Sequence, residues 1–423
     1  MDEVSQLKIV CESYVKRAMA AHKFDLMDFA EYMEPAFARL GYRTPEPGKK
    51  ENILVIRMDE IGNCVMTSGF LRELRRNRPQ AHITLVVSPL VEPLFELCPY
   101  VDEIFEFSSG PGTSLQDVLR GAVNFCLRHL WERHYDLCFC PQWGVDRSWT
   151  LLLGFLSGAR ERVGYSEGVS PEKRESNRGY DRLLTRPLVS PPEVLHEVSR
   201  SFYLLQDFGM DVQNDTMEVW FDDQDRLIAH RLLVNFMENH PVAVVALGAG
   251  RACKKYPVER YVTALRSISE SGMRFVLLGG TDVDLEGSFF TRTMPRGTVL
   301  NLVGQTYLRV TAAILSMADL YIGNDTGIVH LAAALGIPVI EVLAEAADKE
   351  DDKGIYSCYE RFYPWHTPAI VLRPPHALPP CDHTAVLGGC STTMPHCICR
   401  IEPEEIVAAY NAMADYLEDT RIH

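Results

Sequence analysis

The stretch that most constrains the fold of this chain is residues 321–342, which read YIGNDTGIVHLAAALGIPVIEV. Its first apolar residues predict the end of a buried strand, residues 323–327 a tight polar turn, and residues 328–335 a short helix. Gly336 is of the residue type that ends helices, and residues 339–342 are again apolar and β-branched, as in a buried strand. The stretch therefore predicts a β-loop-α-β unit of a parallel sheet.

The polar turn at residues 323–327 has the features of an anion site. Asp325 or Thr326 can serve as the N-cap of the helix, and the glycines allow the backbone to approach a ligand closely. The free N–H groups at a helix N-terminus favour a negatively charged group, phosphate above all. An ordinary capped helix in an α/β core accounts for the same residues, so the turn alone leaves both interpretations open.

Length and composition narrow the class of protein. A chain of 423 residues with 47% hydrophobic and 23% charged residues is expected to form two globular domains. Its formal net charge of −15 argues against a nucleic-acid-binding surface. No apolar run reaches the roughly 18 residues of a membrane-spanning helix, and the acidic start MDEVSQLK does not resemble a signal peptide. We therefore expect a cytoplasmic protein.

Hydrophobic periodicity divides the chain into four parts. Residues 1–46 carry apolar side chains at three- and four-residue spacing, which predicts a helical appendage that packs against the body or forms an oligomer. Residues 47–225 alternate apolar strands with helical stretches, as do residues 226–400. A terminal helix within 401–423 is expected to pack back on the first domain. The predicted fold class is α/β with two parallel sheets.

The strands expected in the first α/β domain are residues 52–57, 82–87, 101–105 and 135–140. Residues 64–77 are expected to form a helix. Because functional loops of parallel sheets lie at the carboxyl ends of the strands, the loops at 58–63 and 141–147 are the ones expected to bind ligand. The polar, proline-rich segment 166–195 predicts a loop or flap rather than core.

Four sequence blocks, taken together and in this order, resemble one enzyme family. They are NILVIRMDEIGNCVMTSGFLRELRRNRP from residue 52, SGARERVGY at 157–165, LGAGRACKKYPVERY from residue 247 and IGNDTGIVHLAAALGIPVI from residue 322. From about residue 50 to 415 the chain is similar to glycosyltransferase family 9, the bacterial heptosyltransferases of lipopolysaccharide assembly. The resemblance implies a GT-B fold, two Rossmann-like domains facing across a cleft, with the acceptor bound mainly by the first and a nucleotide-sugar donor by the second. It also implies an inverting, metal-independent transfer of a nucleotide-activated heptose, with ADP-heptose as the expected donor and no further cofactor.

In the second domain the resemblance places the donor diphosphate at the turn of residues 323–327. The family pattern puts a lysine near the phosphates; Lys254 matches best, Lys255 is the near alternative, and a solvated loop charge is the ordinary explanation of either. His330, one turn into the helix, is either a donor contact or a packed residue. Lys254 is the expected catalytic cation. The expected donor-binding residues are Gly248, Lys255, Gly279, Gly280, Thr281, Asn324, Asp325, Thr326, Gly327 and His330.

One departure from the family pattern concerns the catalytic base. Members usually carry an aspartate in the first loop as the proposed base for the acceptor hydroxyl, whereas this chain has Asn63, which cannot take up the proton. Asp59 and Glu60 lie in the same loop, and Asp146 of the facing loop is a third candidate. We expect Asp59 or Glu60 to act as the base and Asn63 to orient the acceptor. The expected acceptor-binding residues are Arg57, Thr67, Gln142, Asp146 and Arg147.

Two other functions remain open. A catalytically weakened or inactive homologue that acts as a scaffold is motivated by Asn63. A nucleotide-sugar epimerase of similar architecture would need acid/base groups but no acceptor pocket. The expected partners of the transferase are a nucleotide-sugar donor and a glycolipid or glycan acceptor, without nucleic acid. Peripheral association with the cytoplasmic face of the inner membrane, and an oligomer formed through the N-terminal helices, are compatible with this expectation.

Most of the twelve cysteines lie singly in apolar runs and are expected to be reduced core thiols. The exceptions fall in one tail segment, at Cys381, Cys390, Cys397 and Cys399. Four thiols can bind zinc or iron tetrahedrally, and His383, His396 or Cys358 could replace one of them. The spacing is not that of a standard zinc motif, so a structural metal, reduced thiols and a disulfide remain alternatives.

Overall fold

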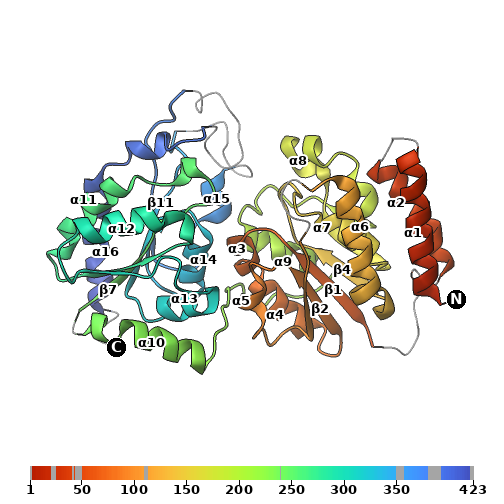
Figure 1. Cartoon of the computed structure of the whole chain (residues 1–423), viewed down its shortest axis with the longest axis horizontal. Helices are drawn as coiled ribbons and strands as arrows, with labels where there is room; N and C mark the ends of the chain where they lie inside the picture. The colour runs from red at the N-terminus through yellow and green to blue at the C-terminus, as the bar shows by residue number, and fades with distance from the viewer. Residues whose placement is uncertain are drawn as a thin grey trace. The chain divides into compact units, whose positions relative to one another are not determined.

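The computed structural model of the protein describes residues 2–20, 25–40, 42, 50–108, 113–238, 240–348, 357–379 and 392–419. Its residue contacts divide the chain into two compact units, each with one parallel sheet (Figure 1). Unit 1 consists of Met1–Glu60 and Gly69–Asp215, and unit 2 of Ile61–Ser68 and Thr216–His423. The predicted α/β class with two parallel sheets is confirmed, and the boundary predicted between residues 46 and 47 lies outside the described residues.

The strands of unit 1 are β1 (Asn52–Arg57), β2 (His82–Val87), β3 (Glu103–Glu106), β4 (Leu137–Cys140), β5 (Glu161–Tyr165) and β6 (Arg186–Leu188). They are all parallel and lie in the order β3-β2-β1-β4-β5-β6. The helices are α1 (Glu3–Ala20), α2 (Leu26–Arg39), α4 (Ser68–Asn77), α5 (Glu92–Phe95), α6 (Leu115–Phe125), α7 (Thr150–Leu156), α8 (Pro171–Ser176) and α9 (Glu197–Asp207), with short turns η1 (Cys126–Leu130), η2 (Trp131–Arg133), η3 (Glu167–Val169) and η4 (Tyr180–Leu183). Strands β1 and β2 are continuous apolar runs because a parallel sheet is covered on both faces.

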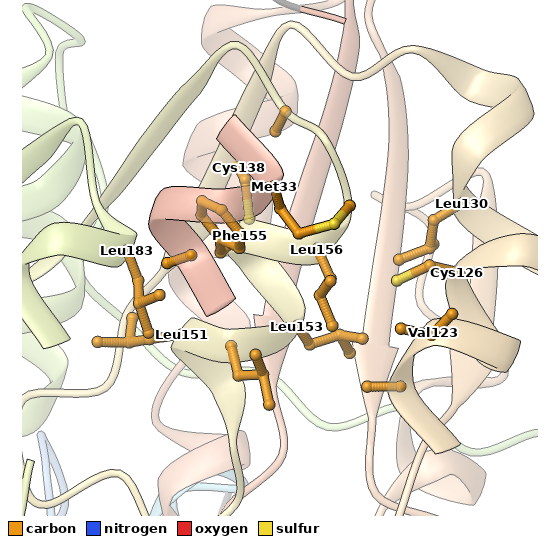
Figure 2. Packing of buried hydrophobic residues seen from close by; sticks show 14 of the residues in the cluster. Met33, Val123, Cys126, Leu130, Cys138, Leu151, Leu153, Phe155, Leu156 and Leu183 are labelled. Atoms are coloured by element: carbon orange, nitrogen blue, oxygen red, sulfur yellow. The ribbon is translucent and has the colours of Figure 1, made fainter. Parts of the chain in front are cut away.

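The N-terminal helices pack against the body of unit 1. Met33 and Phe37 of α2 are buried together with the apolar residues of α7, and the rings of Phe37 and Phe155 lie edge to face with centroids 5.8 Å apart. Figure 2 shows Met33 beside Phe155 and Leu156 in this core. The predicted packing against the body is therefore confirmed, because the apolar faces of α1 and α2 are used inside the unit.

Three details of unit 1 differ from the sequence-based expectation. The third and fourth strands begin at Glu103 and Leu137, two residues later than predicted, and the helix expected over residues 64–77 is interrupted after Val65. Segment 166–195 is not a flap, since it contributes β6 to the sheet and buries Lys173 and Asn177. Its polar side chains bond to buried backbone groups, a role that hydrophobic patterning does not reveal.

The strands of unit 2 are β7 (Val242–Ala246), β8 (Arg274–Leu278), β9 (Val299–Asn301), β10 (Leu320–Asn324), β11 (Val339–Val342) and β12 (Ala369–Leu372). They are parallel in the order β12-β11-β10-β7-β8-β9. The helices are α3 (Ile61–Val65), α10 (Asp223–Met237), α11 (Val258–Ser269), α12 (Asp284–Thr293), α13 (Leu308–Leu315), α14 (Gly327–Ala334), α15 (Cys358–Phe362) and α16 (Pro403–Asp419), with short turns η5 (Ala252–Lys254), η6 (Thr281–Val283) and η9 (Cys397–Arg400). Neither α10 nor β12 was predicted.

The β-loop-α-β unit predicted for residues 321–342 is confirmed as β10, α14 and β11. Thr326 is the N-cap, and its Oγ1 accepts a hydrogen bond from the N–H of Ile328 at 3.2 Å. Gly336 has a φ of 72°, the left-handed conformation that ends helices. At Gly323 a side chain has no room, because a Cβ would lie 2.6 Å from the hydroxyl of Tyr321. Sequence and structure agree on this element because the conformation of the chain requires a capping residue at Thr326 and glycines at residues 323 and 336.

The terminal helix α16 belongs to the core of unit 2. Its buried residues Ile406, Ala409 and Met413 form one apolar stripe at helical spacing and join the cluster that contains Tyr261 and Leu265 of α11. This packing differs from the expectation that the helix returns to the first domain. The stripe is matched by the face of α11, which the sequence-based reading did not consider.

Candidate active site

In both sheets, the loops that follow the first and the fourth strand leave the sheet from neighbouring strands. In each unit the first strand lies beside the fourth, so β1 neighbours β4 and β7 neighbours β10. After these two neighbouring strands, the chain continues toward opposite edges of the sheet. Ligands of open α/β sheets bind at the carboxyl ends of such strands. The loops after β1 and β4 in unit 1, and after β7 and β10 in unit 2, are thus the candidate ligand sites.

In unit 2 this position carries an ion pair between Lys254 and Asp325. Lys254 ends η5 in the loop after β7, and Asp325 follows β10 directly. The Lys254 Nζ lies 2.6 Å from the Asp325 Oδ2, and the two side chains are 18% and 10% exposed. Burial raises the pKa of the Asp325 carboxyl, but the charge and hydrogen bond of Lys254 outweigh it and the net pKa is lowered. The pair is therefore ionised at the N-terminal end of α14.

Asn324 and Thr326, which are expected to bind the donor, also make structural contacts within unit 2. The Asn324 side chain is fully buried; its Nδ2 donates to the carbonyls of Leu247 and Gly248, and its Oδ1 accepts from the Tyr256 N–H and the Tyr261 hydroxyl. Asn324 thus ties the loop after β10 to the loop after β7. The hydroxyl oxygen of Thr326 accepts the hydrogen bond that caps the helix. Both residues position the backbone that a phosphate would meet.

The remaining expected donor residues lie on neighbouring loops at the same sheet edge. Gly279 and Gly280 follow β8, and Thr281 opens η6. A Cβ at Gly279 would lie 2.5 Å from the Val283 side chain, so this backbone requires glycine, whereas a Cβ at Gly248 meets no atom within 4 Å. Lys255 bonds to Asp282 at 2.9 Å, but Asp282 is 62% exposed, so that pair contributes little.

A buried histidine and a buried glutamate lie close to the ion pair. His330 of α14 is 3% exposed, and burial lowers its pKa to about 4, so the ring is neutral at physiological pH. Glu341 of β11 is 2% exposed, and burial raises its pKa well above the ordinary value. Among the described residues, the His330 Nδ1 and the Glu341 Oε2 have no hydrogen-bond partner. Sequence reasoning missed Glu341; its signal was a single acid inside the apolar strand VIEV.

In unit 1 the end of β1, the loop that follows it and helix α9 together form a cluster of alternating charges, made up of Arg57, Asp59, Glu197 and Arg200. The Arg57 Nε lies 2.7 Å from the Asp59 Oδ1, and its NH2 lies 4.0 Å from the Glu197 Oε2. The Arg200 NH1 donates to the Glu197 Oε1 at 2.9 Å. Burial raises the pKa of Asp59, Arg57 opposes this rise and Glu197 adds to it, which gives about 6. Glu60, the neighbouring candidate base, is exposed.

Sequence reasoning missed Glu197 and Arg200. They fall three residues apart on α9 and hence on one helix face, and both are buried, at 2% and 0% exposure. The sequence signal for a buried charged pair was the three-residue spacing of these two residues beside the apolar stripe of the helix. Nothing in the sequence indicated that their partner would be Arg57, which is far away along the chain.

The loop after β4 contains acceptor candidates that are mainly structural. Both oxygens of Asp146 accept backbone N–H groups, from Ser148 and Thr150 at Oδ1 and from Leu151 at Oδ2. This carboxylate therefore caps the start of α7. Arg147 is largely exposed and bonds to Glu172 at 3.0 Å. Gln142 is 7% exposed and donates to the Val145 carbonyl at 3.0 Å.

A buried lysine supports the same loop. Lys173 is 1% exposed, and its Nζ donates to the carbonyls of Gln142, Trp143 and Tyr165 at 3.2, 3.0 and 3.0 Å. Burial lowers its pKa to about 8, although Asp146 and Glu197 favour the charged form. The three hydrogen bonds fix the backbone of the loop.

Asn63 and Thr67 lie on α3 and in the turn that follows it, in the part of the chain grouped with unit 2. The Thr67 hydroxyl donates to the Asn63 carbonyl at 2.9 Å, and Thr67 is 2% exposed. Thr67 therefore stabilises the turn. Asn63 is partly exposed on a short helix.

The cysteine tail is described only in part. Cys381, Cys390 and His383 lie outside the described residues. Cys397 is 1% exposed, packs with Cys253 of η5, and its Sγ lies 3.3 Å from the His396 Nδ1. Within the described ranges, no group of three or more His, Cys, Asp or Glu side chains is arranged to hold a metal ion. The contact of Cys397 with Cys253 joins the tail to the loop that carries Lys254.

Comparisons with known proteins agree with this architecture. Residues 153–350 match the model of glycosyltransferase family 9 (heptosyltransferase). The chain is 22% identical over 298 residues to lipopolysaccharide heptosyltransferase 2 of Escherichia coli (strain K12), across 68% of this chain and 81% of that protein. The structure of a family 9 glycosyltransferase from Veillonella parvula DSM 2008 gives a TM-score of 0.68 at 18% identity, over 86% of this chain and 97% of that one. That of E. coli ADP-heptose lps heptosyltransferase II gives 0.63 at 20% identity, over 88% and 99%.

Two Rossmann-like units with these neighbours define the GT-B fold class. The match of residues 153–350 to the family 9 model, together with the heptosyltransferase relatives, indicates a glycosyltransferase that is similar to the lipopolysaccharide heptosyltransferases. The resemblance of the four sequence blocks is thus confirmed. In the described part of the chain, no helix combines the length and the apolar character needed to cross a membrane.

Proposed function

We propose that the protein transfers a heptose from ADP-heptose to lipopolysaccharide core, with inversion at the anomeric carbon. The observation that carries the proposal is the Lys254–Asp325 pair at the N-terminal end of α14, at the switch point between β7 and β10. ADP-heptose appears in the name of the E. coli neighbour, and lipopolysaccharide in the name of the E. coli relative. Because the sequence identity to these proteins is low, the nature of the donor and of the acceptor is proposed for this chain and is not transferred from them.

On the donor side, the diphosphate binds where the backbone N–H groups of α14 and the ammonium of Lys254 converge. Positive charge at this point stabilises the negative charge that develops on the leaving diphosphate. Asp325 holds the ammonium in place, and the glycine loops after β7 and β8 let the nucleotide approach the backbone. No further cofactor is needed in this proposal.

On the acceptor side, Asp59 takes the proton of the acceptor hydroxyl. The hydroxyl oxygen then forms the new bond to the anomeric carbon, and the bond from that carbon to the diphosphate oxygen breaks, so that the electron pair leaves with ADP. A base is most effective when its pKa is close to the working pH. Because the pKa of Asp59 is about 6 and Glu60 is exposed, we assign the base to Asp59.

A thermal-shift screen with ADP-, GDP- and UDP-linked sugars tests the proposal. ADP-heptose at 100 times its Kd should stabilise the folded protein by about 2.7 kcal/mol, while GDP- and UDP-sugars should have smaller effects. Lys254→Ala should reduce the shift at the same ligand concentration without unfolding the protein. If no nucleotide sugar raises the melting temperature, the transferase assignment of this site is wrong.

A glycolipid acceptor also implies a place of action. We propose that the protein works as a peripheral protein at the cytoplasmic face of the inner membrane. Cosedimentation with vesicles that contain lipopolysaccharide, against vesicles of phospholipid alone, tests this: equal recovery from both would contradict acceptor-dependent association. A catalytically weakened scaffold is the second candidate function, because Asn63 replaces the usual base.

A further inference from the structure

The charged cluster of unit 1 contains one carboxylate that the proposed reaction does not use, Glu197. Its Oε1 accepts the hydrogen bond of Arg200 at 2.9 Å, and its Oε2 lies 4.0 Å from the Arg57 NH2. The same Arg57 contacts Asp59 through its Nε at 2.7 Å. One guanidinium is therefore shared between two carboxylates.

The two carboxylates differ in their access to solvent. The Asp59 side chain is 10% exposed, whereas the Arg57 and Glu197 side chains are each 3% exposed. Asp59 is thus the member of the three that a ligand can reach, and Glu197 lies behind Arg57 in the interior. A buried charge acts on its neighbours with little screening by solvent or salt.

Glu197 is held in this position by well-defined contacts. Arg200 is fully buried, its guanidinium lies 3.8 Å from the ring centroid of Trp143, and its Nε donates to the Val194 carbonyl at 3.2 Å. Charged and titratable groups around Glu197 also include Lys173 of α8, which Asp146 and Asp181 influence in turn, and the hydroxyl of Tyr165. Arg57 is a cation that lies within ion-pair distance of both Glu197 and Asp59.

This arrangement has a clear electrostatic consequence for Asp59. An arginine paired with a single buried carboxylate stabilises its ionised form and makes it a weak base. A second carboxylate near the same arginine opposes this effect. The direction agrees with the contributions to the pKa of Asp59, which burial raises, Arg57 lowers and Glu197 raises.

We propose that Glu197 is a positioning residue that acts through Arg57 to set the proton affinity of Asp59, and thereby the pH range in which the acceptor hydroxyl is activated. The inference deepens the proposed function and rests on Asp59 as the base. It assigns to a buried residue of α9, which touches no substrate, control over the acid side of the pH–rate profile.

The first test measures the Asp59 carboxyl directly. Protein labelled with ¹³Cγ-aspartate is titrated by NMR, and the Asp59 signal is assigned by its loss in Asp59→Asn. In Glu197→Gln the midpoint of this titration should move to lower pH by about 0.5–1 unit, because the opposing charge is removed. An unchanged midpoint overturns the inference, whether or not the protein transfers heptose.

The second test uses the reaction. Transfer from ADP-heptose to lipopolysaccharide from a heptose-deficient strain is measured between pH 5 and 9, and the acid limb of kcat/KM should shift with the NMR midpoint. Glu197→Asp keeps the charge and should keep the limb near its wild-type position. If Asp59→Asn transfers at the wild-type rate, the assignment of the base fails, while the NMR result still decides the role of Glu197.

A matched control is available in the same unit. Glu73 is also a buried glutamate, 1% exposed, and it bonds to Arg76 at 2.8 Å on α4. Glu73→Gln makes the same chemical change at an equally buried glutamate outside the cluster. It should lower the melting temperature without moving the acid limb. If it moves the limb as Glu197→Gln does, the effect is a general loss of packing and the inference is wrong.

Discussion

The two units use the same strand order and put different electrostatics at the same place. At the switch point of unit 2, Lys254 pairs with Asp325, and the pKa of Asp325 is lowered. At the switch point of unit 1, Arg57 contacts Asp59 at 2.7 Å and lies 4.0 Å from Glu197, and the pKa of Asp59 rises to about 6. Both aspartates are largely buried beside a cation. The balance between burial, the paired cation and the neighbouring carboxylates favours an ionised aspartate in unit 2 and a proton acceptor in unit 1.

The largest effect should follow from removing the carboxylate of unit 1. Asp59→Asn should lower transfer by about 10²–10⁴-fold, because the acceptor hydroxyl loses its base. Binding of ADP-heptose, measured by calorimetry, should stay unchanged because the donor site is in unit 2. Glu60→Gln is the control and should keep nearly full activity, since Glu60 is exposed. Equal losses in both variants would remove the distinction between the two carboxylates.

The same variant makes a prediction about stability and pH. The pKa of Asp59 in the folded protein, about 6, lies above its ordinary value of 3.8, so folding favours the protonated form. The stability from this group is present below about pH 4 and is lost as the pH rises through 6. Asp59→Asn should therefore reduce the fall in melting temperature between pH 4 and pH 8. A steeper fall in the variant would contradict the raised pKa.

The ion pair of unit 2 should affect donor affinity. Lys254→Ala should raise the Kd for ADP by about 10–100-fold, since a charge-assisted hydrogen bond contributes about 1.5–3 kcal/mol. The control is Lys255→Ala, which removes a cation of the same loop whose partner Asp282 is largely exposed and should change the Kd less than threefold, about 0.6 kcal/mol. If the two variants weaken ADP binding equally, the buried pair has no special part in binding.

A substitution of Lys173 tests whether its hydrogen bonds hold the loop after β4 in unit 1. Lys173→Met should lower the free energy of unfolding by about 2–3 kcal/mol, because three buried carbonyls lose their donor. Denaturant unfolding measures this loss. ADP binding by unit 2 should remain at the wild-type level. A stable Lys173→Met protein would show that the loop does not depend on these hydrogen bonds.

The smallest effect is expected at the position that departs from the family pattern. If Asp59 is the base, Asn63→Asp should change the transfer rate by less than about threefold, which is well under 1 kcal/mol in the barrier. Steady-state kinetics with the same donor and acceptor provide the measurement. A large gain of activity would instead favour the weakened-homologue interpretation, and the contrast between the two units would lose its catalytic meaning.

The sequence predicted those features that depend on local residue types. The β10–α14–β11 unit was predicted because its glycines, its helix cap and its apolar runs are each typical of one kind of local structure. The strands β1 and β2 were predicted because most of their residues are apolar. Lys254 and Asp325 were singled out as separate residues, but their pairing depends on β7 and β10 being neighbours. The cluster around Arg57 was not predicted, since α9 reaches it only through the tertiary fold. Segment 166–195 was misjudged because its buried residues are polar.

The packing of the first two helices has a consequence for the order in which the protein matures. Met33 and Phe37 are synthesised before their partner Phe155, which lies on α7. At synthesis rates of about 5–20 residues per second, the apolar faces of α1 and α2 remain uncovered for on the order of ten seconds. During that interval both helices present apolar surface to which chaperones can bind.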